Sequence, residues 1–316
     1  MAKTSVRRII LDVDTGIDDA WALIYALRAP TLDVLGITTG FGNADVDTTT
    51  RNTLAVTDLL QSRVPVYRGA VKPLCRPWDG PVTSYHGVNG LGNASVPDPL
   101  RPPENTEAVD FLHQVLTALP HEVTIVTLAR LTNIARLLLY DPHVAPLISR
   151  LVIMGGAAFV PGNVTPVAEA NIWGDPEAAD LVFQSGIPIT MVGLDVTHRA
   201  RLTWDDLDRL DSSLPYAAMM RDATAFYLKA YERDHPEMQG WCPIHDPLAV
   251  AVAEDPSLVA VRRYPVRVEH AGRWTTGMTV VDARMGEQPH GIEVALDLNA
   301  PAFLHRFWDR VGIAPA

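Results

Sequence analysis

Short apolar runs alternate along this chain with longer segments in which apolar residues recur every three or four positions. The runs at 6–13 and 32–40 are typical of buried strands. The segment between them places a set of apolar residues on one face of a predicted helix: Ala20, Leu23, Ile24 and Leu27. Such alternation is typical of βα units arranged around a mainly parallel sheet.

The alternation continues toward the C-terminus. Further strands are predicted at 64–69, 123–128, 151–156 and 187–194, and further helices at 48–61, 106–119, 132–140 and 175–186. The pattern then becomes mostly helical from 202 to 255, and an antiparallel pair (264–270 and 277–283) precedes a closing helix at 301–312. We therefore predict an α/β fold with a mainly parallel, open, Rossmann-like central sheet flanked by helices, an appended helical region and a small antiparallel pair. No linker divides the chain, so a single domain over 1–316 is expected.

One long segment, 69–105, is rich in Pro and Gly and shows no regular pattern. Loops of that length in compact domains are usually functional or disordered. We predict that it forms a lid over a site, with His86 as a substrate contact.

Composition excludes some partners. The chain holds 26 basic and 37 acidic side chains, a net charge of −11, without a run of Lys or Arg, so nucleic acids and anionic membranes are not expected partners. Only Cys75 and Cys242 are present, which favours a reduced, cytoplasmic location over a disulfide framework. No apolar stretch approaches the roughly 18 residues of a membrane span.

The first predicted strand leads into the acidic segment DVDTGIDDA, which holds four carboxylates within eight residues: Asp12, Asp14, Asp18 and Asp19. The positive end of the next helix dipole stabilises each nearby carboxylate by only roughly 0.3–1 kcal/mol, which is too little to offset the repulsion among four of them. A divalent cation with oxygen ligands, Ca²⁺ or Mg²⁺ rather than Zn²⁺, would offset the rest. Two alternatives stay open: a solvated cluster at a helix start, and a haloacid dehalogenase-like phosphatase, whose motif fits poorly because Gly16 stands where Thr or Val is usual.

Two later segments add polar groups. In VAEANIWGDPEAA, Glu169 and Asn171 point to the same side if the segment is extended, and could bind vicinal hydroxyls. Asp175 precedes a proline and is typical of a helix N-cap. In CPIHDPLAV, His245 and Asp246 precede an apolar helix, so Asp246 either caps that helix or belongs to a site.

Together these segments resemble a known family. Seven motifs occur in the order and spacing seen in the inosine-uridine preferring nucleoside hydrolases, from about Ile9 to the closing helix. They are DVDTGIDDA, TTGFGN, LTNIA, MGGA, GNVTPVAEANIWGDPEAA, GLDVTH and IHDPLAV. The resemblance implies hydrolysis of the N-glycosidic bond of purine or pyrimidine ribonucleosides to a free base and ribose, with bound Ca²⁺, in nucleoside catabolism and salvage. It also implies a homodimer or homotetramer.

The resemblance assigns roles by position. It implies metal binding by the carboxylates of Asp14, Asp19 and Asp246 and the backbone carbonyl of Leu128. It implies sugar contacts from Asp18, Asn43, Met154, Asn163, Glu169 and Asn171. Asp14 would also take a proton from a water that Ca²⁺ polarises, and His245 would protonate or hydrogen-bond the departing base. Asp12 is expected to support the acidic loop from a position outside the set of direct ligands.

The sequence departs from the family pattern near the site. Ala129-Arg130 replaces the usual Gly-Pro or Gly-Gly before LTNIA, and Ala170 stands where relatives often carry Phe. Arg130 either alters the turn beside Leu128 or points to solvent, and Ala170 opens the wall near the ribose 5′ side. These departures leave open a nucleoside-binding protein without turnover.

Base preference is only loosely bounded by the sequence. His245 stands where the purine-specific branch of similar enzymes carries Trp, which argues against strict purine specificity. Trp78 and Trp241 either stack on the base or serve as ordinary packing residues.

Overall fold

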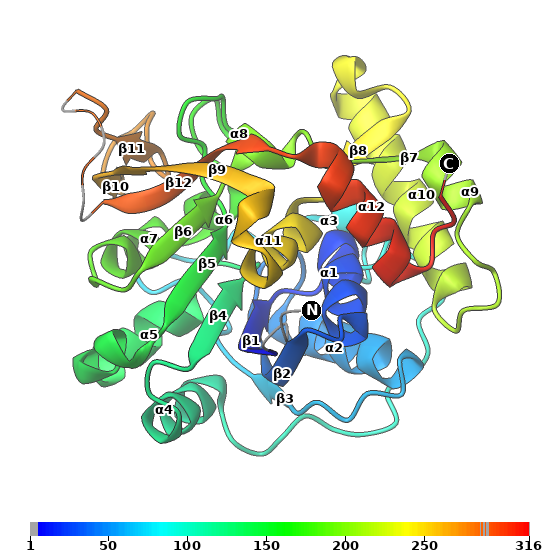
Figure 1. Cartoon of the computed structure of the whole chain (residues 1–316), viewed down its shortest axis with the longest axis horizontal. Helices are drawn as coiled ribbons and strands as arrows, with labels where there is room; N and C mark the ends of the chain where they lie inside the picture. Colours follow the sequence, from blue (N-terminus) through cyan, green and yellow to red (C-terminus); the bar gives the residue numbers. More distant parts are fainter. Residues whose placement is uncertain (1–5, 285, 287, 289–290, 316) are drawn as a thin grey trace, which may run out of the picture.

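The computed structural model describes residues 6–284, 286, 288 and 291–315. Within these residues an eight-stranded sheet forms the centre (Figure 1). Its strands, in spatial order, are β3 (Val66–Arg68), β2 (Leu32–Thr39), β1 (Arg7–Val13), β4 (Val123–Thr127), β5 (Arg150–Met154), β6 (Ile189–Val192), β12 (Ile292–Leu298) and β9 (Val259–Tyr264). Neighbouring strands pair in parallel except β12 and β9, which are antiparallel. The predicted mainly parallel sheet flanked by helices is confirmed.

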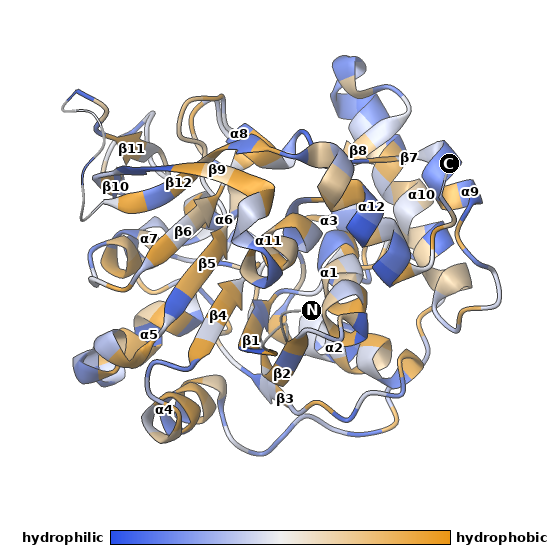
Figure 2. Ribbon diagram, in the orientation of Figure 1, coloured by the Kyte–Doolittle hydropathy of each residue, from blue (hydrophilic) through white to orange (hydrophobic). Residues whose placement is uncertain are grey.

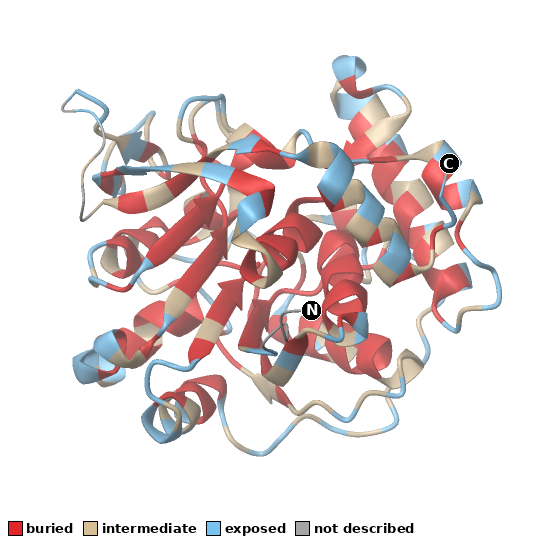
Figure 3. Ribbon diagram, viewed as in Figure 1, coloured by how far each residue is buried: buried red, intermediate tan, exposed pale blue. Residues whose placement is uncertain are grey.

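Two helical layers cover the sheet because its central strands are apolar on both faces (Figure 2). In β1, Ile9, Leu11 and Val13 pack into one layer and Ile10 into the other, as the two-residue period of a strand requires. The first layer contains α1 (Ile17–Arg28), α2 (Val46–Leu59), α10 (Ala217–Asp234), α11 (His245–Glu254) and α12 (Ala300–Val311). The second layer contains α4 (Ala108–Ala118), α5 (Thr132–Tyr140) and α7 (Pro176–Phe183). The central strands β4, β5 and β6 are mostly buried, whereas the edge strand β9 is partly exposed (Figure 3).

Shorter elements connect these layers. The helices are α3 (Thr83–His86), α6 (Ala170–Gly174), α8 (Leu194–Thr197) and α9 (Trp204–Asp208). The strands are β7 (Arg201–Thr203) with β8 (Trp241–Pro243), and β10 (Val266–Val268) with β11 (Thr279–Val281), each pair antiparallel. Among the described residues, none of the helices combines the length and apolar character that a membrane crossing needs.

The C-terminal part differs from the sequence-based prediction. The antiparallel pair exists, but Pro265 separates its first strand from β9, which begins at Val259 and joins the main sheet. The strand β12 was not predicted at all; it pairs with β6, about a hundred residues earlier in the chain. The region expected to be mostly helical also holds β7 and β8. Such long-range pairings leave little local signal in the sequence.

The order of the strands creates a natural ligand site. From β1 the chain moves outward to β2 and β3, and then returns to the other side of β1 to form β4, β5 and β6. The carboxyl ends of β1 and β4 therefore lie at a topological switch point, where open α/β sheets bind their ligands.

Candidate active site

A cavity of about 310 Å³ lies at this switch point. Residues that follow β1, β4 and β5 line it, and α3, α10 and α11 contribute the other walls. The predicted site residues that line the cavity are Asp18, Asn43, His86, Leu128, Met154, Asn163, Glu169, Asn171, His245 and Asp246. The remaining two, Asp14 and Asp19, are fully buried. Asn43 connects them to the cavity wall: its backbone N–H donates to Asp14 Oδ2 at 2.8 Å, and its Nδ2 donates to Asp19 Oδ2 at 3.1 Å.

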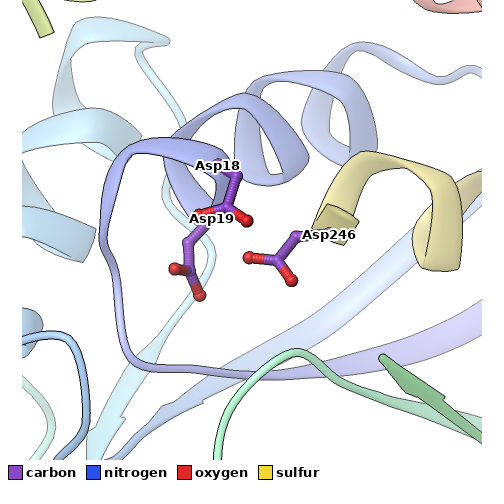
Figure 4. A group of neighbouring side chains, drawn as sticks. All are labelled: Asp18, Asp19 and Asp246. Carbon is purple, nitrogen blue, oxygen red and sulfur yellow. The ribbon is translucent and has the colours of Figure 1, made fainter. Parts of the chain in front are cut away.

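Three carboxylates converge beside the cavity (Figure 4). Asp18 and Asp19 belong to the first turn of α1 and Asp246 to the first turn of α11, and one oxygen of each lies within 4.8 Å of the others. Burial raises the pKa of Asp18 to about 7, and burial followed by repulsion from neighbouring carboxylates raises the pKa of Asp19 and of Asp246 well above the usual value. Asp246 is not the N-cap of its helix, since Ile244 occupies that position. Its carboxylate belongs to the cluster.

The two carboxylate oxygens of Asp14 differ in their hydrogen bonding. Its Oδ2 accepts hydrogen bonds from the Asn43 N–H and from Nη1 of Arg130, whereas the buried Oδ1 has no hydrogen-bond partner. Burial raises the pKa of Asp14, and the charge and hydrogen bond of Arg130 oppose that rise. Arg130 is itself only 7% exposed. Of the two alternatives for its side chain, pointing to solvent is therefore wrong.

The available donors fit a hard divalent cation. The cluster of Asp18, Asp19 and Asp246 and the unpartnered Asp14 Oδ1 offer only oxygen, the ligand type that Ca²⁺ and Mg²⁺ prefer. The Leu128 carbonyl oxygen accepts a hydrogen bond from Asn171 Nδ2 at 2.8 Å and keeps a second lone pair. A cation would also offset the mutual repulsion that disfavours ionisation of these buried carboxylates.

Asp12 takes no part in lining the cavity. It is fully buried, and its Oδ1 accepts hydrogen bonds from Thr38 Oγ1 at 2.6 Å and Asn133 Nδ2 at 2.7 Å. The same Asn133 amide donates to the Thr39 carbonyl and accepts from the Ala70 N–H. Asp12 thus ties the end of β1 to its neighbours, which is the supporting position expected for it.

Glu169 and Asn171 both line the cavity, but Asn171 lies in α6, so the two residues do not share an extended segment. Glu169 is the N-cap of α6, and its carboxylate accepts hydrogen bonds from the N–H groups of Asn171, Ile172 and Gly156 at 2.9–3.2 Å. Asn171 joins two strand ends by donating to the carbonyls of Leu128 and Met154 at 2.8 and 3.1 Å. Capping by the Glu169 carboxylate thus stabilises the start of α6.

Asn163 and Asp175 form hydrogen bonds at the two ends of α6. The exposed Asn163 accepts a hydrogen bond from the Ala170 N–H at 3.0 Å. Asp175 is the N-cap of α7, as predicted, and also accepts from the Leu74 N–H and Thr132 Oγ1.

His245 sits in a chain of hydrogen bonds at the opposite wall. Its Nδ1 lies 2.8 Å from Thr197 Oγ1, and its Nε2 lies 3.1 Å from the Tyr231 hydroxyl. Burial lowers the pKa of His245 well below its usual value, with smaller contributions from the nearby histidines. The neutral ring is therefore the main form near pH 7, with a hydroxyl group against each of its two nitrogens.

The segment 69–105 supplies part of the same wall. Its short helix α3 places His86 in the cavity, where Nδ1 accepts a hydrogen bond from the Ile17 N–H at 3.2 Å. Burial, followed by the charge of Arg130, lowers the pKa of His86 to about 3. The Val82 N–H donates to the Asn43 carbonyl at 3.0 Å, which joins this segment to the acidic loop. Its movement as a lid stays a prediction.

Some cavity residues were missed by the sequence analysis. Tyr227 and Tyr231 line the cavity from α10 and His235 lines it from the C-cap of that helix; their spacing of four residues was a signal that one helix face carries polar aromatic groups. Trp78 and Trp241, in contrast, do not line it. Trp78 packs edge-on against Phe41, and Trp241 lies under the guanidinium of Arg201, so neither ring is a wall of this cavity.

The fold and the site define a Rossmann-like protein with an acidic, hydrogen-bonding pocket for a small polar ligand. Residues 9–305 match the family model described as inosine-uridine preferring nucleoside hydrolase. The chain belongs to this family of ribonucleoside hydrolases, as its sequence motifs predicted, and the match favours it over the phosphatase alternative.

Individual relatives agree over nearly the whole chain. The pyrimidine-specific ribonucleoside hydrolase RihA of Escherichia coli O9:H4 (strain HS) is 40% identical over 307 residues, which cover 96% of this chain and 97% of the relative. A purine-preferring ribonucleoside hydrolase from Gardnerella vaginalis is 38% identical, with a TM-score of 0.92 over 97% of this chain and 98% of its own. A plant nucleoside hydrolase, PpNRh1, is 34% identical, with a TM-score of 0.91 over 98% of this chain and 100% of its own.

Proposed function

We propose that this protein hydrolyses the N-glycosidic bond of ribonucleosides in a Ca²⁺-dependent reaction and releases a free base and ribose. The observation that carries the proposal is the convergence of Asp18, Asp19 and Asp246 next to an unpartnered Asp14 oxygen at one edge of a nucleoside-sized cavity. Family membership supports the reaction class. The oxygen-only donor set supports the choice of a hard cation.

The bound cation would supply a polarised water of lowered pKa. Asp19, Asp246, Asp14 and the Leu128 carbonyl are the groups we expect to hold the cation. Asp14 is also the proposed general base, because its Oδ1 has no hydrogen-bond partner and is free to accept a proton from the attacking water.

The acidic wall suits the transition state of this reaction. Cleavage of the C1′–N bond passes through an oxocarbenium-like state, so carboxylates fixed nearby stabilise the developing positive charge. Asp18, Asn43, Glu169 and Asn171 are the proposed contacts for the ribose hydroxyls, with Asn163 at the outer end and Met154 against the sugar ring. Water is the nucleophile, and no covalent intermediate with the protein is formed.

The opposite wall serves the leaving base. His245 and Tyr231 are joined by a 3.1 Å hydrogen bond, and Tyr227 lies against Tyr231 with its hydroxyl 3.4 Å away. We propose that His245, held at Nδ1 by Thr197, exchanges its hydrogen bond from Nε2 to Tyr231 for one to the departing base, and that His86 contacts the substrate from α3. Because His245 stands where the purine-specific branch of similar enzymes carries Trp, we expect a pocket that is not restricted to purines.

An activity panel tests the proposal. Purified protein, stripped of metal, is incubated with inosine, uridine, cytidine and adenosine, with and without added Ca²⁺, and the release of reducing sugar is followed. We expect ribose release from at least one nucleoside and loss of that activity in chelator. Calorimetric binding of a nucleoside without release of ribose in the presence of Ca²⁺ would instead favour the binding protein without turnover.

A cytoplasmic location and a homodimer or homotetramer stay predictions. Light scattering behind a size-exclusion column measures the molar mass in solution. A mass of one chain, 34.5 kDa, would contradict the predicted assembly.

A further inference from the structure

Arg130 is a buried cation inside the site. It lines the cavity, is 7% exposed and donates from Nη1 to Asp14 Oδ2, while its buried Nε has no hydrogen-bond partner within the described part of the chain. Burying a guanidinium is costly unless a carboxylate offsets its charge. Asp14 does so here, although Asp14 is also an expected ligand of the divalent cation.

The surrounding backbone leaves room for this side chain. A Cβ atom added at Gly42 would lie 1.8 Å from Asp14 Oδ2 and 2.2 Å from Arg130 Nη1, and one added at Gly174 would lie 2.6 Å from Arg130 Nε. Neither glycine has a positive φ, so its backbone conformation does not itself require glycine. The absence of side chains at these two positions accommodates the Arg130–Asp14 pair.

The charges around the pair are unbalanced. Asp18, Asp19 and Asp246 converge on a common space, and within the described part of the chain none of them forms an ion pair with a guanidinium or ammonium group, whereas Asp14 is neutralised by Arg130. A positive charge on one oxygen of Asp14 weakens the attraction of a divalent cation for the other oxygen, because the two cations repel each other in a poorly solvated site.

We propose that Arg130 is an internal counter-ion of the cation site, which holds Asp14 in the cation-free protein and lowers the affinity of the site for a divalent cation. This inference rests on the proposed function, which supplies the cation. It concerns a positioning residue that acts through Asp14. Removal of the guanidinium then has two opposite effects: the cation-free protein loses the partner of a buried carboxylate, and the cation binds more tightly.

The test is a calorimetric titration of metal-stripped protein with CaCl₂ together with thermal unfolding in chelator and in saturating Ca²⁺. Arg130→Met removes the charge and Arg130→Lys keeps it. Arg136→Met is the control: Arg136 lies on α5, which begins two residues after Arg130, its side chain is 40% exposed, and it forms an ion pair with Glu107 at 3.6 Å. We expect Arg130→Met to tighten Ca²⁺ binding by a factor of about 5–150, the usual size of coupling between two sites. Arg130→Lys and Arg136→Met should stay near the wild-type affinity.

Thermal unfolding gives a second readout. The melting temperature of Arg130→Met should fall in chelator and recover in Ca²⁺, because the cation then takes over the neutralisation of Asp14. Arg130→Gln is the second neutral variant and undergoes the same two measurements if the Met variant does not fold in chelator.

The possible results separate the two proposals. Wild-type protein that binds Ca²⁺, with neutral Arg130 variants of equal or weaker affinity, overturns the counter-ion inference alone. Wild-type protein that binds no Ca²⁺ overturns the proposed cation dependence and the counter-ion inference with it.

Discussion

Replacement of Asp14 by Ala is the most informative perturbation of this site. It removes the proposed base and a proposed cation ligand, so we expect ribose release to fall by at least about 10²–10⁴-fold, the usual contribution of a general base. It also leaves the Arg130 guanidinium buried without its partner, and breaking a buried pair in this way costs about 3–5 kcal/mol of stability. The kinetic loss is measured as kcat/KM by reducing-sugar release, and the stability loss by urea unfolding.

The double variant Asp14→Ala/Arg130→Met separates these two effects. Because it removes both charges of the buried pair, it should recover most of the stability lost in Asp14→Ala while turnover stays abolished. This variant also keeps the test informative if Asp14→Ala alone does not fold.

Asp12→Asn is the matched control, since Asp12 lies two residues away and is equally buried. Asn can still accept the hydrogen bonds from Thr38 and Asn133 through its Oδ1, but its amide group replaces the buried, unpartnered Oδ2 of Asp12. We expect Ca²⁺ affinity to fall by about 10–100-fold with kcat retained at saturating Ca²⁺, as for other groups that support metal ligands. Equal and negligible effects of Asp14→Ala and Asp12→Asn would refute this division of roles.

Three further predictions concern the walls of the cavity and the cation. Asn171→Ala removes the donor to two strand-end carbonyls, so unfolding by urea should show a loss of about 1–3 kcal/mol, and KM for the nucleoside should rise; an unchanged KM would contradict a ribose contact. Tyr231→Phe removes the hydroxyl behind His245, and we expect kcat to fall by about tenfold, equivalent to the loss of one hydrogen bond of about 1.4 kcal/mol, with KM little changed. Chelator should lower the melting temperature of the wild-type protein, because a cation bound only to the folded state stabilises it; a melting temperature independent of Ca²⁺ would argue against the cation site.

Periodicity predicted most of the sheet, because β1, β4, β5 and β6 are short apolar strands with helices of clear period between them. It failed at β9 and β12, whose partners lie far away in sequence or across an antiparallel edge. It made no prediction of α6, which begins where the Glu169 side chain caps the backbone N–H groups of the next residues.

The composition of the site could be predicted from sequence because its motifs are contiguous. DVDTGIDDA, AEAN and IHDP each place several polar groups within a few residues, and their order along the chain identifies the family. Arg130 shows the limit of this approach. Its departure from the family pattern was visible, but whether it turned to solvent or inward depends on the space beside Gly42 and Gly174, which are far from it in sequence.

The sequence by itself thus determined the class of fold, the family and most of the chemical groups at the site, because local periodicity and short motifs are properties of neighbouring residues. Only the tertiary structure decided which carboxylates share one space, that Asp14 faces a guanidinium while Asp18, Asp19 and Asp246 face one another, and that Tyr231 stands behind His245. The physical reason is that charge repulsion, burial and hydrogen bonding act over a few ångströms in space. Those distances are set by the packing of α1 against α11 and of α10 against α3.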